Sequence, residues 1–239
     1  MDSRFDLSDS YGYAGSDAVA LQRGFINRVF GWMTGGLAIT GAVACLVAVR
    51  FGNFVATNPK MFFVLLIAEL LLVFSLSAAI RRISPTAALL GFVLFAALNG
   101  VTLSWIFMVY SLNSITATFL TTSLTFGVMG LYGWITKRDL TGIGSLAFMA
   151  LWGLIIASLV NLFLRNQLFD MIVSMIGVLV FVGLTAYDTQ KIKQLAFASG
   201  EGVFSEADGK KAAIIGALTL YLDFINLFLY MLRFFGNRK

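Results

Sequence analysis

Residues 212–235 read AAIIGALTLYLDFINLFLYMLRFF, an apolar run that Asp223 interrupts near its middle. About 20 consecutive apolar residues are enough for a helix to cross the ~30 Å hydrocarbon layer of a membrane. Thr219, Asp223, Asn226 and Tyr230 recur at helical spacing and therefore form one polar stripe. Because such a stripe is costly against lipid, we expect this last helix to be central in a bundle.

Six further apolar runs of similar length precede this one. They cover residues 30–49, 61–80, 86–110, 115–136, 143–164 and 171–190. The 239-residue chain is 59% hydrophobic and 12% charged, which is about half the charge of a soluble domain. The pattern predicts an all-α integral membrane protein. We expect a seven-transmembrane-helix bundle over residues 25–239 and a flexible polar N-terminal tail over residues 1–24.

The residue counts exclude several kinds of chemistry. The sequence contains no histidine, so a Ser-His-Asp triad, a histidine-zinc site and a histidine-ligated haem are excluded. The single cysteine, Cys45, excludes an intramolecular disulfide. We therefore expect no cofactor. The net charge of +5 is explained by basic loops at the membrane surface, and no nucleic-acid partner is expected.

The distribution of lysine and arginine predicts the orientation. Cytoplasmic loops of membrane proteins are enriched in these residues. With the N-terminus inside, eleven of the 17 basic residues lie in inside segments. They are Arg4, Arg23, Arg28, Arg81, Arg82, Lys137, Arg138, Lys191, Lys193, Lys210 and Lys211. The C-terminus carries three basic residues that conflict with an outside position: Arg233, Arg238 and Lys239. The last helix therefore either crosses the membrane fully despite this charge or re-enters and returns to the cytoplasmic side. We expect an integral membrane protein with a cytoplasmic N-terminus.

Three acidic residues fall at membrane depth: Glu69, Asp188 and Asp223. Each costs about 2.5–3.5 kcal/mol on insertion scales, so each is a functional candidate. If the helix that carries Asp188 continues to Ala198, Asp188 and Asp223 lie at similar depth on adjacent antiparallel helices. Two packed carboxyl groups would share a proton, and the pair could act as a proton sensor or a Ca²⁺ ligand. The alternative is two separately hydrogen-bonded, protonated carboxyl groups.

Further polar residues are candidates for a gate or a pore. Glu69 either lines the same polar cavity as the pair or is protonated against a neighbouring hydroxyl. Arg81 and Arg82 end the second run, where flanking basic residues are common, but Arg81 could also reach inward to a carboxylate. Thr219 and Asn226 flank Asp223 on the polar stripe and are candidates for the ion path.

The last two runs resemble the Bax inhibitor-1 family, also called the transmembrane Bax inhibitor motif family. Residues 181–190 (FVGLTAYDTQ), 220–229 (LYLDFINLFL) and 232–238 (LRFFGNR) carry the resemblance. It implies a seven-helix bundle with the last helix central and a pH-sensitive calcium leak. Because residues 232–238 match bacterial members, it also implies a location in the bacterial inner membrane. It also implies that Asp188 and Asp223 form the paired-aspartate sensor and that Arg81 is the nearest candidate for the family's gating arginine.

Two other functions compete with a calcium leak. Members of the family are linked to cell-death suppression, and one bacterial relative to inhibition of a membrane-anchored ATP-dependent protease. The resemblance is thus also compatible with an interaction protein whose partner is a membrane protease. In that case residues 1–24 would bind the partner. An intramembrane aspartyl protease is the third candidate. Such enzymes use Gly-x-Gly-Asp, whereas Leu220 and Leu222 stand at the glycine positions before Asp223, so we expect no enzyme.

Overall fold

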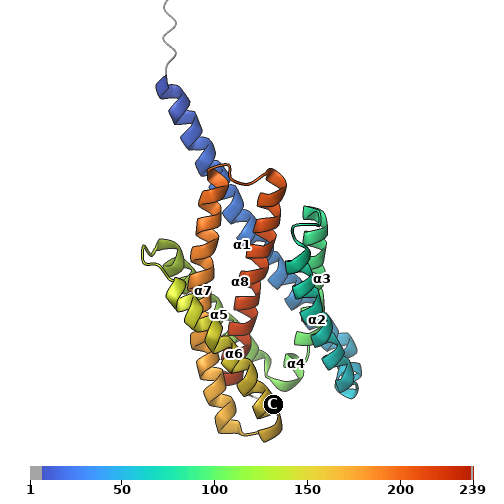
Figure 1. Cartoon of the computed structure of the whole chain (residues 1–239). Coiled ribbons are helices and arrows are strands. Elements are labelled where there is room, and N and C mark those ends of the chain that lie inside the picture. Colours follow the sequence, from blue (N-terminus) through green and yellow to red (C-terminus); the bar gives the residue numbers. More distant parts are fainter. Residues whose placement is uncertain (1–6, 238) are drawn as a thin grey trace, which may run out of the picture.

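The structure is a computed structural model that describes residues 7–237 and residue 239. All eight elements of these residues are helices, and they pack side by side in one bundle (Figure 1). Their bounds are α1 Leu7–Thr57, α2 Pro59–Ala79, α3 Pro85–Leu103, α4 Ile106–Val109, α5 Leu112–Ile135, α6 Thr141–Leu164, α7 Gln167–Gly200 and α8 Glu206–Phe235. The expected all-α class is confirmed.

Six of these helices are long and apolar enough to span a membrane. They are α1, α5, α6, α7, α8 and the segment Pro85–Val109, which joins α3 and α4. The described part of α2 adds a shorter apolar stretch, Phe63–Ala79. The count agrees with seven membrane helices and establishes the protein as an integral membrane protein.

Several helices begin or end at residue types that are common at helix termini. Pro59 and Pro85 stand at the start of α2 and α3, where a missing backbone N–H costs nothing. Ser84 and Ser205 cap α3 and α8 by accepting the backbone N–H of the residue three positions later. Gly202, with φ of 73°, lies just after the end of α7 and turns the chain towards α8.

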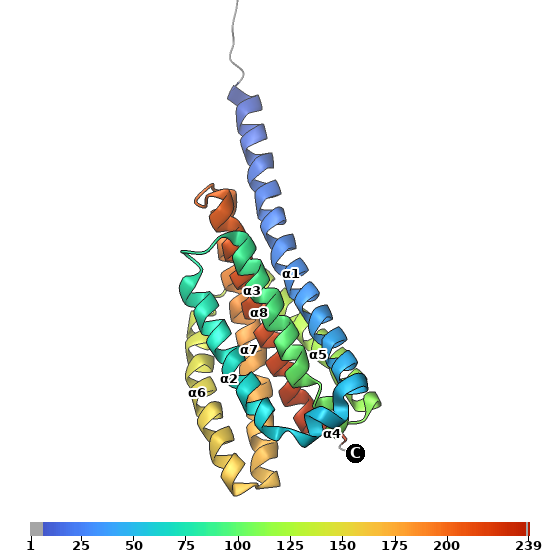
Figure 2. The ribbon, with the colours of Figure 1, turned by 90° about the vertical axis from the view of Figure 1, so that its right-hand side faces the viewer.

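Helix α1 differs from the expected flexible tail. The structure has one continuous helix from Leu7, so residues 7–24 belong to the same 51-residue element as the first span. No proline occurs between residues 7 and 57, and nothing in that stretch forces the helix to stop. The N-terminal part of α1 projects beyond the rest of the bundle (Figures 1 and 2). Residues 1–6 of the expected tail lie outside the described residues.

Helix α8 is the most buried of the candidate spans. It contacts α1, α3, α5 and α7. Its most apolar stretch is 67% buried, against at most 39% in the other five spans. The side chains of Leu220, Tyr221 and Leu227 are fully buried. Aromatic rings fix its position, since Phe92 and Phe95 of α3 meet the Tyr221 ring edge-on at 5.8 Å.

The last helix runs through the bundle without a break. Thirty residues at 1.5 Å each give about 45 Å, enough for a full crossing. The C-terminus therefore lies at the opposite end of the bundle from the start of α1 (Figure 2). Of the basic residues there, Arg233 pairs with Asp170 of α7 at 3.2 Å. The re-entrant alternative does not fit this continuous helix.

Helices α5 and α6 approach α7 closely through glycine. A Cβ atom at Gly133 of α5 would overlap the backbone carbonyl oxygen of Ala186. A Cβ atom at Gly144 of α6 would meet the ring of Tyr187. Both contacts lie within two residues of Asp188. The backbone of α7 around Asp188 is thus held in place by two neighbouring helices.

Candidate functional site

The structure brings the two predicted aspartates together. The carboxyl group of Asp188 on α7 lies beside that of Asp223 on α8, within reach of a hydrogen bond. Both lie inside candidate membrane spans. Asp223 is 5% exposed, whereas Asp188 is half-buried. Because a carboxylate carries no hydrogen, a bond between two carboxyl groups requires a proton on one of them.

Their meeting follows from the lengths of the two helices. Helix α7 continues past Lys191 to Gly200, as the sequence predicted for residues 191–198. The connection to α8 is short, so the two helices are antiparallel neighbours (Figure 1). Asp188 thus lies several turns below the end of α7 and reaches the level of Asp223.

One oxygen of the pair is enclosed by the bundle. Asp223 Oδ2 is buried, and no N–H or hydroxyl group of the described residues donates to it. The Oγ1 atom of Thr189, the residue after Asp188, is also buried and has no hydrogen-bond partner among the described residues. A buried polar atom without a partner costs about 1–3 kcal/mol. A proton, a water molecule or a cation bound to the Asp223 oxygen would therefore remove this cost.

The ligands available to a metal are few. Among the described residues there is no group of three or more acidic, histidine or cysteine side chains. Two carboxyl groups and neighbouring hydroxyls suit a hard cation such as Ca²⁺, which prefers oxygen and accepts water in its remaining positions. The positive charge of Lys191 acts on Asp188 from one turn further along α7. The sequence shows Lys191 at i+3 from Asp188, but the residue was predicted only as part of a basic inside loop and not as a neighbour of the pair.

The other residues of the polar stripe bond to their own helix. Thr219 Oγ1 donates to the carbonyl of Ile215 at 3.0 Å. Asn226 Nδ2 donates to the carbonyl of Leu222 at 2.8 Å. Tyr230 stacks on Phe181 of α7, with the ring centroids 5.7 Å apart. The stripe therefore faces α7, and Asp223 is its ionisable member.

Glu69 belongs to a second polar cluster. Its Oε1 accepts a hydrogen bond from the hydroxyl of Thr102, and its Oε2 accepts one from Asn99 Nδ2 at 3.0 Å. The Tyr221 hydroxyl donates to Asn99 Oδ1 at 3.0 Å and lies 2.7 Å from Thr40 Oγ1. The Glu69 cluster, which we define as Thr40, Glu69, Asn99, Thr102 and Tyr221, thus joins α1, α2, α3 and α8.

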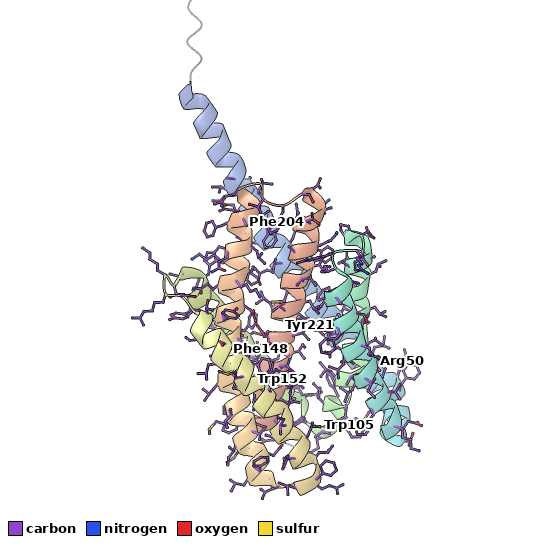
Figure 3. All side chains as sticks on the ribbon, in the orientation of Figure 1. Arg50, Trp105, Phe148, Trp152, Phe204 and Tyr221 are labelled. Atoms are coloured by element: carbon purple, nitrogen blue, oxygen red, sulfur yellow. The ribbon has the colours of Figure 1, made fainter. Side chains whose placement is uncertain are left out.

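The two clusters lie on different sides of α8. Tyr221 and Asp223 are two residues apart, so their side chains diverge by about 200° around the helix. Tyr221 faces α3, as Figure 3 shows, whereas Asp223 faces α7. Glu69 is therefore satisfied by a hydroxyl and an amide and does not join the pair. Sequence reasoning named Glu69 but missed its partners, because an amide and a hydroxyl on an apolar helix give no sign of which way they face.

Arg81 is not brought to the aspartate pair. It follows the end of α2 in the turn towards α3, and its side chain is exposed, as is that of Arg82. Within the described part of the chain, neither arginine forms an ion pair.

The chain is similar to several proteins of bacteria, some of them named membrane proteins. The sequence model of a family described as inhibitor of apoptosis-promoting Bax1 matches residues 22–239. Inner membrane protein YbhL of Escherichia coli K12 is 48% identical over 219 residues, covering 90% of this chain and 92% of that protein. An uncharacterized protein of Borreliella burgdorferi is 41% identical, covering 92% and 95%. An uncharacterized membrane protein of Streptococcus pyogenes is 37% identical, covering 97% and 99%.

Proposed function

This chain belongs to the Bax inhibitor-1 family of membrane proteins, and from that premise we propose that it is a pH-sensitive calcium leak gated by Asp188 and Asp223. We also propose the bacterial inner membrane as its location, with the N-terminus cytoplasmic. Two observations support this location: the Escherichia coli relative is named an inner membrane protein, and the expected inside loops carry an excess of basic residues.

The contact between the two carboxyl groups carries the proposal. Protons and Ca²⁺ bind to the same carboxylate oxygens, so they compete for the pair. The buried Asp223 Oδ2 is the oxygen through which a cation could enter the pair. At low pH the pair is protonated. It then binds the cation more weakly and no longer constrains the gate.

The gate is a shift of α8 relative to α7. We infer that α8 is the central helix, because it contacts four other helices and is the most buried span. A change in the bond between Asp188 and Asp223 acts at the contact between these two helices. Thr219 and Asn226 lie on the same face as Asp223 and would line the ion path. Glu69 and Arg81 would act in the gate through α2, which packs against α3.

Reconstituted liposomes test this function. Purified full-length protein is incorporated into vesicles that contain a calcium indicator, and Ca²⁺ entry is followed between about pH 6 and pH 8, the range in which a shared proton would titrate. We expect protein-dependent flux that changes with pH. Protein-free vesicles control for leakage of the lipid. Flux no greater than in those vesicles at every pH would overturn the proposal.

A second candidate is an interaction protein that restrains a membrane-anchored protease. The projection of α1 beyond the bundle favours it, because this segment is free to meet a partner (Figure 2). Deletion of residues 2–17 separates the two functions. Under the calcium-leak proposal the deletion leaves the flux in liposomes intact. A loss of protease control in cells with unchanged flux would assign the interaction to this segment.

A further inference from the structure

A basic pocket lies where the turn between α5 and α6 meets α7. The cavity has a volume of about 420 Å³. Lys137 and Arg138 line it from the turn, and Lys193 lines it from α7. We call this cavity, with its three basic side chains, the basic pocket. Lys137 and Arg138 belong to the turn and Lys193 to α7, and none of the three belongs to the aspartate pair.

The positive charges of the pocket are not neutralised by the protein. Among the described residues, no carboxylate forms an ion pair with Lys137, Arg138 or Lys193. Asp139 also lines the cavity, but its Oδ1 accepts the backbone N–H and the hydroxyl of Thr141 at 2.9 and 2.6 Å. These bonds hold the pKa of Asp139 below its usual value, so one negative charge stands against three positive ones.

The pocket is held in shape by buried hydrogen bonds. Gln190 is 8% exposed, and its Nε2 donates to the carbonyl of Arg138 at 2.8 Å. Its Oε1 accepts the backbone N–H of Leu140 at 2.9 Å. Lys193 Nζ donates to the carbonyl of Trp134 at 2.6 Å and keeps further N–H groups for another acceptor. The backbone of the turn is therefore fixed on α7, and the Lys193 ammonium is held beside it.

Helix lengths place the pocket at the membrane surface. Helices α5 and α6 have 24 residues each, about 36 Å, which is slightly more than the hydrocarbon layer. The turn between them thus lies at headgroup level, whereas the 34-residue α7 continues past it. Ile135 and Ile143, on the membrane side of the turn, are 64% and 49% exposed. Apolar surface below basic residues matches the acyl chains and the phosphate of one lipid.

We propose that the basic pocket binds the phosphate headgroup of an anionic phospholipid. A guanidinium and two ammonium groups suit a phosphate, and basic pockets between membrane helices are known to take such headgroups. The exposed isoleucines favour a lipid over a free anion, which would leave them unused. This inference does not rest on calcium transport.

Native mass spectrometry of the full-length protein in detergent tests the pocket. Phosphatidylglycerol and phosphatidylcholine are titrated separately, and the affinity of the first bound lipid is compared. The variant is Lys137→Gln/Arg138→Gln, because both side chains are exposed and their loss leaves the bonds of Gln190 and Lys193 in place. Lys210→Gln/Lys211→Gln removes the same charge from α8 outside the pocket and is the matched control.

We expect the wild type and the control to prefer phosphatidylglycerol, and the variant to bind it about 30-fold more weakly. This follows from about 1 kcal/mol for each basic residue near an anionic lipid and 1.4 kcal/mol for each factor of ten. Binding of phosphatidylcholine should not change. No preference for phosphatidylglycerol, or an equal loss in the control, would overturn the proposal. Full displacement of the lipid by glycerol 1-phosphate would show a site for free phosphates and overturn the lipid assignment.

Discussion

Asp188 and Asp223 lie beside each other but differ in their surroundings. Asp223 is buried, and no N–H or hydroxyl group of the described residues donates to its Oδ2, whereas Asp188 is half-buried and lies near the positive charge of Lys191. The pair is thus asymmetric: one side is open to a neighbouring charge and the other is enclosed by the bundle. A change at Lys191 reaches the pair without altering either carboxyl group.

Lys191→Gln tests this asymmetry. A nearby positive charge favours the ionised pair, so its loss should move the midpoint of the pH dependence of calcium flux upward, by roughly half a pH unit at low salt. The shift should shrink as the salt concentration rises, because Lys191 is exposed. The control is Lys210→Gln, which should leave the midpoint in place. An unchanged midpoint for Lys191→Gln would show that this lysine does not act on the pair.

The Tyr221 hydroxyl connects the Glu69 cluster to α8. Tyr221→Phe removes its bond to Asn99 and its contact with Thr40. Asn99 Oδ1 then loses its partner, whereas Thr40 Oγ1 keeps its bond to the carbonyl of Ala96. We expect a loss of about 1–3 kcal/mol in stability, measured by denaturant unfolding in detergent. Tyr230→Phe is the matched control on the same helix, because no hydrogen bond joins its hydroxyl to the described residues. Equal effects of the two changes would contradict the assigned role of Tyr221.

At the scale of the helix, close backbone approach fixes the position of α7. Gly133→Ala places a methyl group against the backbone of Ala186, which cannot move aside as a side chain can. We expect a loss of about 1–3 kcal/mol in the same unfolding measurement. Gly127→Ala on the same helix meets nothing within 4 Å and should be neutral or stabilising by up to about 1 kcal/mol. A neutral Gly133→Ala would show that α5 and α7 are further apart than described.

The helices were predictable from the sequence to different degrees. Apolar length alone located the spans, and the prolines and serines at their starts marked where helices begin. The long α1 was missed because polar composition suggested a loose tail, although no proline breaks that stretch. The meeting of Asp188 and Asp223 was predictable, since the short connection after α7 makes α7 and α8 antiparallel neighbours. The partners of Glu69 were not predicted, although they lie on the next helix, α3, because an amide and a hydroxyl on an apolar helix give no sign of which way they face.

For the whole molecule, the continuous α8 predicts opposite sides for the two termini. Single cysteines are introduced near Arg81, near Lys137 and in the turn after Gly200, in a Cys45→Ser background. Because these loops carry the basic residues, we expect them to be shielded from an impermeant thiol reagent in intact cells and labelled after lysis. A cysteine after Asn237 should be labelled from outside. The opposite labelling would reverse the orientation, and labelling of both kinds of site from one side would refute seven crossings.

The most direct test of the calcium-leak proposal compares Asp188→Asn, Asp223→Asn and the double variant in the liposome flux assay. If the two carboxyl groups form one titrating unit, each single change removes the shared proton site and weakens Ca²⁺ binding. Both single variants should then show flux much less dependent on pH, and the double variant should add little beyond either one. Separate, additive effects of the two changes with a wild-type pH profile would contradict the paired sensor.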